Sequence, residues 1–280
     1  MIRVLCRYEP HLGSAPSDRT GRPPVPNAAT RTLFLTAAIL MATAAGPTAF
    51  AGERRFTFVY EATTMPAGDA EYEQWITWKT HKDADPDFDR IDFRHEIEFG
   101  VTDRLQVGLY LSDWRYQDGA SVRDGAEWRD AAIEIIYNLA DPVTEPFGLA
   151  LYGELKLGDE LVEIEGKLIV QKDIGEWVFA WNGTIEAEWE GPDLAEDKGK
   201  FEQTFGASYQ LSPKLLGGFE LVHEVEYEDW SDWGDPVLYL GPNLSYRPGQ
   251  WWTTITALTQ VTDVDAEPDF QLRLIFGFDF

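Results

Sequence analysis

The sequence predicts an all-β protein, a transmembrane antiparallel up-and-down β-barrel of about 12 strands with a short N-terminal arm. The chain ends in Phe270–Phe280, where aromatic and aliphatic residues alternate with Gln, Arg, Gly and Asp. The same period-two alternation recurs in earlier segments, most of which have roughly the 9–11 residues that cross a bilayer at a tilt. An apolar run near the N-terminus adds a signal for export.

The predicted strands succeed one another along the chain, and each is bounded by turn residues such as Gly, Pro, Asn and Asp. They comprise residues 71–80, 88–99, 105–116, 128–139, 147–157, 161–172, 177–189, 201–211, 215–227, 236–246, 251–261 and 269–280. A shorter alternating segment, 56–63, precedes them. Because single-chain bacterial barrels have even strand numbers, we assign this segment to the arm.

The predicted connections differ in length in a regular way. Tight connections alternate with longer acidic ones, as expected for periplasmic turns and outer loops, and the short link at 158–160 is the exception. The longer connections are 81–87, 117–127, 190–199, 228–235 and 262–268.

The first part of the chain predicts a cleaved secretory leader. An apolar run, Leu33–Ala45, leads to Ala49-Phe50-Ala51, which has the small-x-small pattern of a cleavage site. The run is shorter than the roughly 20 residues that a spanning helix requires. We expect a leader at 1–51 that is cleaved after Ala51, an N-terminal periplasmic arm at 52–69 that tucks into or under the barrel, and the barrel itself at 70–280.

Charge and cysteine content exclude several classes of function. The chain has 23 basic and 49 acidic side chains, of which the leader holds 5 and 2, so the mature part has 23 − 5 = 18 and 49 − 2 = 47. Its formal charge of 18 − 47 = −29 excludes nucleic acid as a partner, because phosphate contacts need clustered Lys and Arg. The single cysteine, Cys6, lies in the leader, which excludes a thiolate metal site. We predict no cofactor and no metal-ligand set.

Alternation alone fits a soluble β-protein as well as a membrane barrel, since both have one apolar face. The export signal and strands longer than the soluble mode of about 5–6 residues favour the membrane. The chain also has eleven Trp and sixteen Phe, many of them near strand ends, where aromatic girdles lie. The tryptophans that we assign to such girdles are Trp75, Trp78, Trp114, Trp128, Trp177, Trp189, Trp251 and Trp252.

The phase of the C-terminal strand assigns the charged side chains to the lumen. Apolar residues such as Leu151, Ile164 and Ile185 then face lipid, and the charged residues between them face inward. The predicted lumen-lining residues are Arg90, Asp92, Arg94, Glu96, Glu98, Asp130, Glu134, Glu154, Lys156, Glu163, Glu165, Lys167, Glu186, Glu188, Glu202, Glu220, Glu224, Glu226 and Arg273. This wall is mixed in sign but mostly acidic, and rings of Asp and Glu favour cations.

A family resemblance rests on three stretches, Tyr60–Gly68, Tyr72–Thr77 and Glu96–Val107. They resemble a family of proteobacterial outer-membrane β-barrels of unknown function, the DUF6662-type proteins, and more distantly the outer-membrane transporters of aromatic-degradation pathways. The resemblance covers roughly the first two hairpins. It implies an outer-membrane location and, through the distant relatives, solute passage, but no catalytic or binding residue.

These observations predict an outer-membrane barrel that acts as a passive channel or transporter for small cationic or neutral solutes. The main alternative is a non-conducting structural or adhesive envelope barrel, because barrels of about 8 strands are filled by side chains whereas 16–18 leave a channel. The third is an outer-membrane lipid hydrolase, which needs a serine activated by histidine. After the leader, His81, His95 and His223 lie in no His-x-Ser context, and the last two face outward, so we assign no catalytic residue.

Several partners follow from a location in the outer membrane of a Gram-negative bacterium. Outer-membrane lipid and lipopolysaccharide would surround the barrel, and the barrel assembly machinery would read the terminal aromatic residues Phe276, Phe278 and Phe280. The acidic run Glu224–Asp235 does not match the spaced calcium loop and is interpreted as solvated. Acidic loops beside lipopolysaccharide phosphates are still candidates to hold bridging Mg²⁺ or Ca²⁺.

Overall fold

The protein is described from a computed structural model, which covers residues 54–228 and 230–280. The predicted leader and its cleavage after Ala51 lie outside the described residues. Within the described ranges no helix is long and apolar enough to cross a membrane.

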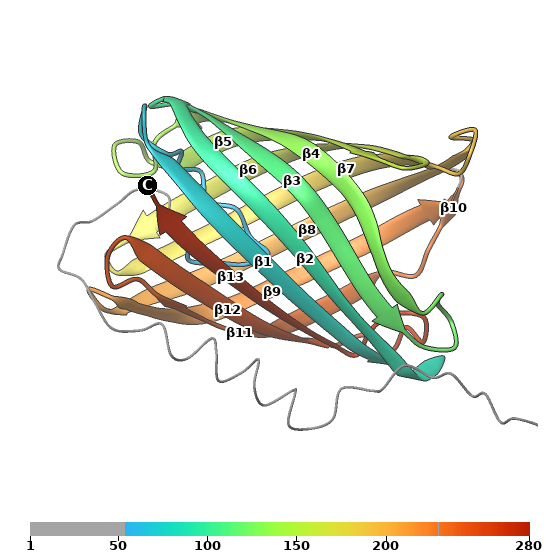
Figure 1. The fold of residues 1–280 in the computed structure, drawn as a ribbon. Helices are drawn as coiled ribbons and strands as arrows, with labels where there is room; N and C mark the ends of the chain where they lie inside the picture. The colour runs from blue at the N-terminus through green and yellow to red at the C-terminus, as the bar shows by residue number, and fades with distance from the viewer. Residues whose placement is uncertain (1–53, 229) are drawn as a thin grey trace, which may run out of the picture. The chain divides into compact units, whose positions relative to one another are not determined.

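The described residues form one closed antiparallel barrel (Figure 1). Each of the long strands pairs with the next long strand in the chain, β9 with β11 included, and β13 pairs with β1 to close the ring. The two-residue β10 pairs only with the end of β9, which leaves twelve of the thirteen strands in the wall. The strands are β1 (Ala70–Lys82), β2 (Asp85–Thr102), β3 (Leu105–Asp118), β4 (Gly125–Ala140), β5 (Gly148–Gly158), β6 (Leu161–Ile174), β7 (Trp177–Glu190), β8 (Glu196–Ser212), β9 (Leu215–Glu228), β10 (Asp232–Trp233), β11 (Val237–Tyr246), β12 (Trp251–Gln260) and β13 (Phe270–Asp279).

The predicted strands and the barrel architecture are confirmed, but several strands run further than predicted. The link at 81–87, predicted to be long, shrinks to the two residues between β1 and β2. A bulge between Thr80 and Lys82, with His81 at a φ of 58°, lets the hairpin continue past the predicted boundary. β8 likewise begins at Glu196 rather than at 201, and continued ladder hydrogen bonds with β7 account for the extension.

The two ends of the barrel differ. We call the end that holds Ala70 and Phe280 the turn end, where β2–β3, β6–β7 and β8–β9 are joined by tight turns. The opposite end is the loop end, and the 261–269 segment between β12 and β13 lies there. Figure 1 shows the C-terminus at the turn end.

The two faces of the wall have opposite character. Leu151, Ile164 and Ile185 are 48%, 51% and 60% exposed on the outside, whereas Glu73 and Glu134 are fully buried inside. An apolar outer surface of this kind is stable in lipid, so the predicted inside-out arrangement is confirmed.

Two of the tryptophans assigned to the aromatic girdles face inward instead. Trp75 and Trp252 are 5% and 0% exposed, and their indole N–H groups donate to Glu73 (2.7 Å) and Glu71 (3.0 Å). The girdle assignment was wrong for these two because a lumen that contains a polypeptide segment has its own apolar core. Trp251, next to Trp252, packs on the outer face against Phe276 with ring centroids 5.9 Å apart.

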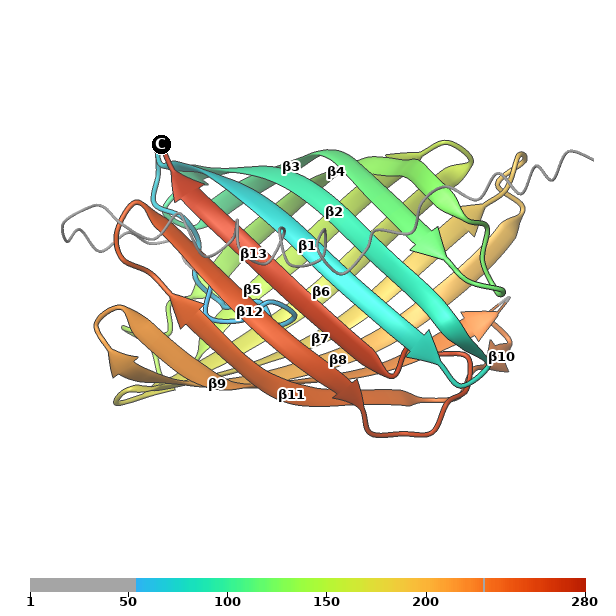
Figure 2. The same cartoon turned by 60° about the horizontal axis from the view of Figure 1, so that its bottom comes forward.

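The segment before β1, residues 54–69, lies inside the ring of strands, and we call it the arm. Figures 1 and 2 show it, in blue, folded back into the barrel near the C-terminus. Its apolar side chains form the core of the lumen: Phe56 and Val59 pack with Val178 and Ala180 of β7. The arm therefore belongs to the packed interior of the barrel.

Candidate functional site: the barrel lumen

The arm divides the lumen into two spaces of unequal size. A cavity of about 510 Å³, which we call the outer cavity, lies on the loop-end side and is bordered by Phe58 and Tyr60 of the arm and by Trp75. A pocket of about 40 Å³ lies on the turn-end side, between Tyr60, Met65 and Gln106. Tyr60 borders both spaces, so the arm separates them.

Side chains of the wall hold the arm by its backbone. The Glu220 carboxylate of β9 accepts hydrogen bonds from three consecutive amides, those of Thr57 (2.9 Å), Phe58 (2.6 Å) and Val59 (3.1 Å). Asn182 of β7 accepts from the Tyr60 amide (2.7 Å) and donates to the Tyr60 carbonyl (2.9 Å). Residues 57–60 of the arm are thus fixed by side-chain hydrogen bonds, whereas its last residues, Gly68 and Asp69, form backbone hydrogen bonds with Gly100 of β2.

Further along the arm, glutamine side chains continue this pattern. Gln171 accepts from the Ala62 amide (2.8 Å), and Gln106 accepts from the Met65 amide (2.8 Å). No sequence pattern indicates these roles, because Gln and Asn at inward positions also fit a water-filled lumen.

The predicted lumen-lining residues all point inward. Most of them border the outer cavity: Arg90, Asp92, Arg94, Asp130, Glu154, Lys156, Glu163, Glu165, Lys167, Glu186, Glu188, Glu202, Glu224, Glu226 and Arg273. The remaining four, Glu96, Glu98, Glu134 and Glu220, are buried beside the arm and away from this cavity. The arm therefore divides into two separate sets the residues that the sequence placed on one wall.

Sequence reasoning missed eight charged cavity residues, five of which are basic. They include Lys79, Lys82, Arg115, Arg129 and Lys200. With these added, ten Lys and Arg and thirteen Asp and Glu border the cavity, a formal charge of 10 − 13 = −3. The wall is therefore close to balanced rather than mostly acidic.

A bulge explains why β3 residues were missed. The register shifts between Tyr110 and Asp113 on both edges of β3. Before the shift Tyr110 faces inward, and after it Asp113 and Arg115 face inward, so the phase changes by one residue. Strict alternation predicts the opposite face for the second pair.

The charges of the outer cavity are separated across the barrel. The cavity residues of β13, β1, β2 and β3, which we call the basic arc, carry 6 − 2 = +4. Those of β6 to β9, the acidic arc, carry 2 − 8 = −6. The two arcs lie on opposite sides of the ring because β4–β5 and β11–β12 separate them. A solute in the cavity would experience a field directed across the lumen.

Three of the six Lys and Arg side chains of the basic arc, those of Arg90, Arg94 and Arg115, are already in ion pairs. The Arg94 Nε lies 2.6 Å from Asp113 Oδ2, and the Arg115 Nε lies 2.8 Å from Asp92 Oδ1. Lys79, in contrast, forms no ion pair with a described residue.

Arg273 likewise has no ion pair within the described chain. Its Nε donates to the Thr77 hydroxyl (2.9 Å), its Nη1 donates to the Thr57 carbonyl (3.1 Å), and its guanidinium lies 3.9 Å from the Phe58 ring centroid. Lys79, Lys82 and Arg273 are therefore the cations of the basic arc without an ion pair in the described chain.

On the loop above the cavity, burial and then the charge of Glu224 raise the pKa of Glu267.

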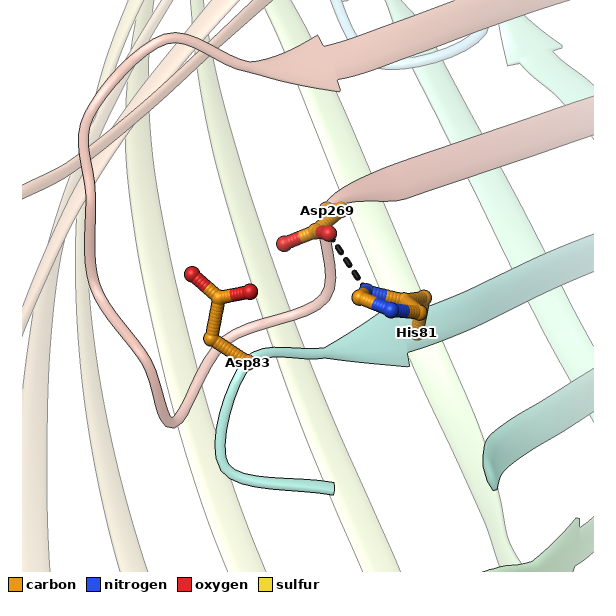
Figure 3. Close-up of side chains that lie close together, drawn as sticks. All are labelled: His81, Asp83 and Asp269. Atoms are coloured by element: carbon orange, nitrogen blue, oxygen red, sulfur yellow. Dashed lines mark hydrogen bonds and ion pairs between the residues drawn. The ribbon is translucent and has the colours of Figure 1, made fainter. Parts of the chain in front are cut away.

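An exposed group of titratable residues lies at the loop end. The His81 Nδ1 is 2.5 Å from Asp269 Oδ2, and Asp83 lies close to both (Figure 3). The His81 and Asp269 side chains are 45% and 44% exposed, so water would compete with these side chains for any metal ion bound there.

The acidic run predicted to be a solvated loop has a local structure. β10 pairs with Tyr227 and Glu228, and the Tyr227 ring packs against Trp230 and Trp233 with centroids 6.3 and 4.8 Å away.

A lipid hydrolase would need a histidine that is hydrogen-bonded to a serine. His95 shares a hydrogen bond with the Tyr72 hydroxyl (2.9 Å) and His81 with Asp269, and neither is hydrogen-bonded to a serine of the described chain.

A family model described as "Family of unknown function (DUF6662)" matches residues 48–269. The chain belongs to this family. No curated protein matches it.

Two solved structures share the fold of this DUF6662 member. The COG4313 outer membrane channel from Pseudomonas putida F1 is 12% identical, with a TM-score of 0.60 over 80% of this chain and 100% of that one. The NanC porin is 8% identical, with a TM-score of 0.51 over 75% of this chain and 98% of that one. At these identities the likeness establishes the outer-membrane barrel fold alone.

Proposed function

We propose that the protein is a passive outer-membrane channel for small polar solutes of zero or positive net charge. It lies in the outer membrane of a Gram-negative bacterium with the turn end in the periplasm and without enzymatic activity. The apolar outer face, the polar lumen and the likeness to an outer membrane channel support this proposal. The observation that supports the proposal most directly is the outer cavity, whose volume lies within the roughly 300–1,000 Å³ of small-molecule sites.

The two arcs narrow the class of solute. A zwitterion would place its anionic group near Lys79 and Arg273 and its cationic group toward the acidic arc. A multiply charged anion would meet a wall whose formal charge is −3. The charge separation therefore favours zwitterions and cations over dianions.

Passage through this channel requires the arm to move, because Tyr60 closes the path between the two spaces of the lumen. The arm makes this movement feasible, since side-chain hydrogen bonds hold it and no strand ladder has to break. A barrel whose arm never moves would be the non-conducting structural alternative. Outer-membrane lipid, lipopolysaccharide and the assembly machinery remain the partners that this location entails.

The proposal is tested with refolded protein in planar bilayers and in liposomes. We expect small conductance steps with a preference for K⁺ over Cl⁻, and faster liposome swelling with glycine or lysine than with succinate. Refolded protein that gives neither steps nor swelling would establish the non-conducting alternative. A preference for chloride or succinate would contradict the assigned solute class.

A further inference from the structure

Five carboxyl groups are buried together beside the arm, at the turn end of the lumen. They are Glu71, Glu73, Glu96, Glu98 and Glu134, each between 0% and 2% exposed. They come from β1, β2 and β4. Gly108 of β3 lies between Glu98 of β2 and Glu134 of β4, because it is the register partner of both. A side chain at position 108 would collide with the Glu96 carboxylate, so the glycine keeps this space open.

The cluster has far less positive charge than negative charge. Arg54 of the arm is its ion-pair partner, with Nε 3.1 Å from Glu73 Oε1 and Nη2 3.2 Å from Glu98 Oε1. Five carboxylates and one guanidinium leave a formal charge of 1 − 5 = −4. Burying such a charge without compensation is strongly unfavourable.

Hydrogen bonds do not supply the missing compensation. Tyr110 donates to Glu134 Oε2 at 2.5 Å, and indole N–H groups donate to Glu71 and Glu73. Both oxygens of Glu96 and the Oε1 of Glu134 are buried without a hydrogen-bond partner in the described part of the chain. Glu96 thus directs a wholly unsatisfied carboxylate into the cluster.

We propose that Glu96, Glu98 and Glu134 bind a hard divalent cation, with Ca²⁺ as the better fit. One carboxylate oxygen from each lies within 4.8 Å of the others. Oxygens that share a Ca²⁺ lie about 2.3–2.6 Å from it, which allows separations of this size. Ca²⁺ accepts the irregular geometry of ligands from β2 and β4, the two strands that flank β3, whereas Mg²⁺ demands near-ideal octahedral ligands.

A second group with the same spacing, Glu71, Glu73 and Glu98, shares one residue with the first. We assign the ion to the group of Glu96 because both Glu96 oxygens lack a hydrogen-bond partner in the described chain, whereas Glu71 and Glu73 each accept an indole hydrogen bond. One bound divalent ion changes the formal charge of the cluster from −4 to −2 and gives the Glu96 carboxylate a partner.

The cation would also tie the arm to the wall. Tyr60 of the arm donates to Glu134 Oε2 at 3.3 Å, and Arg54 of the arm is bonded to Glu98. Two of the three ligands therefore contact the arm directly. The consequence that metal removal loosens the arm and raises conductance rests on the proposed function, whereas the binding site does not.

Terbium luminescence tests the site directly. Tyr60 and Tyr110 are bonded to Glu134, so tyrosine excitation would sensitise Tb³⁺ bound there. Refolded, metal-stripped protein should show saturable luminescence at one ion per chain that excess Ca²⁺ displaces. The absence of a saturable, Ca²⁺-sensitive signal would overturn the proposal.

Variants separate this site from the exposed acids of the loops. Glu96→Gln should weaken Tb³⁺ binding at least tenfold, whereas Glu176→Gln, in the exposed turn after β6, should leave it unchanged. The pair Asp83→Asn and Asp265→Asn removes loop-end carboxylates, and the luminescence should persist. A signal lost with the loop pair and kept in Glu96→Gln would move the ion to the loops and contradict our assignment.

A second measurement covers the case in which Glu96→Gln fails to fold. Ca²⁺ should shift the urea midpoint of the wild-type protein to higher concentration but leave that of Gly108→Ala unchanged, because the added methyl fills the site. A wild-type midpoint that does not respond to Ca²⁺ would mean that protons, not a metal ion, neutralise the cluster. Saturable Tb³⁺ binding in a protein that never conducts would keep the site and reject the channel.

Discussion

The outer cavity and the turn-end lumen are built from the same inward positions of the same strands, yet their electrostatics differ. In the outer cavity acids and bases are almost equal in number, and most are paired within reach of water, as with Arg115 and Asp92, whose side chains are 19% and 27% exposed. At the turn end five carboxylates are buried around the single guanidinium of Arg54, which is ion-paired with Glu73 and Glu98. The arm makes this difference, because it fills the lumen beside these carboxylates and leaves the outer cavity open on the loop-end side.

An inward position in a barrel therefore has no fixed role. A glutamate that faces the cavity tunes a solvated field, which salt and water screen. A glutamate that faces the arm is either a hydrogen-bond acceptor for the arm, as Glu220 is, or a ligand for a cation, as we propose for Glu96.

The largest effect on stability is expected for Trp252→Ala at the turn end. Trp252 is fully buried and donates to Glu71, so the substitution should lower the free energy of unfolding by about 3–5 kcal/mol. The neighbouring Trp251→Ala on the lipid face serves as the control and should cost clearly less. Urea titration in lipid vesicles measures both, and equal losses would contradict the inward placement of Trp252.

Glu220→Ala should release the arm. The variant leaves three arm amides without their acceptor, each costing about 1–3 kcal/mol if it stayed buried, so the arm should leave the lumen instead. We expect trypsin to cleave after Arg54 or Arg55 and the conductance to rise. Glu228→Ala, at the exposed loop end of the same strand, is the matched control. An arm that stays protected in Glu220→Ala would show that its other hydrogen bonds and its apolar packing hold it without Glu220.

The strands were predictable from the sequence because alternation persists wherever one face meets lipid and the other does not. The phase carried over from β13 correctly turned Glu154, Glu163 and Glu186 inward. It failed for Asp113 and Arg115, since a bulge leaves no mark in the composition of β3. In β1, Glu73 and Trp75 share a face, so neither side of that strand reads as apolar.

The arm was the least predictable part of the molecule. Residues 56–63 alternate, but the pattern does not reveal that the partners are single side chains of distant strands. The link between Glu220 and the amides of Thr57, Phe58 and Val59 is set by tertiary structure. For the same reason, the division of the predicted lumen residues into two sets could not be read from the chain.

Smaller effects are expected in the outer cavity. Lys79→Gln and Arg273→Gln each remove a cation without an ion pair in the described chain, so each should increase the preference for K⁺ over Cl⁻. Lys214→Gln, in the exposed β8–β9 turn, should leave selectivity unchanged. Reversal potentials in a KCl gradient measure this, and an unaltered preference in both cavity variants would show that the basic arc does not face the permeating ion.

The smallest effect is expected at the rim of the cavity. Arg129 lies 3.8 Å from both Glu127 and Glu190, and all three side chains are between 26% and 42% exposed. Exposed pairs of this kind contribute roughly 0–1 kcal/mol, so Arg129→Ala should change the urea midpoint little. A loss of unfolding free energy comparable to that of Trp252→Ala would show that this ion-pair group contributes to stability as a buried one does.

If the arm closes the channel, locking the arm in place should abolish conductance. A Cβ built on Gly148 lies 3.0 Å from the Cβ of Ala62, so Ala62→Cys with Gly148→Cys should form a disulfide after a small shift. The chain expected after leader removal holds no other cysteine. We predict that the oxidised protein gives no conductance steps and that dithiothreitol restores the steps seen with Ala62→Cys alone. Equal conductance in the oxidised and reduced states, with the disulfide verified, would contradict the account.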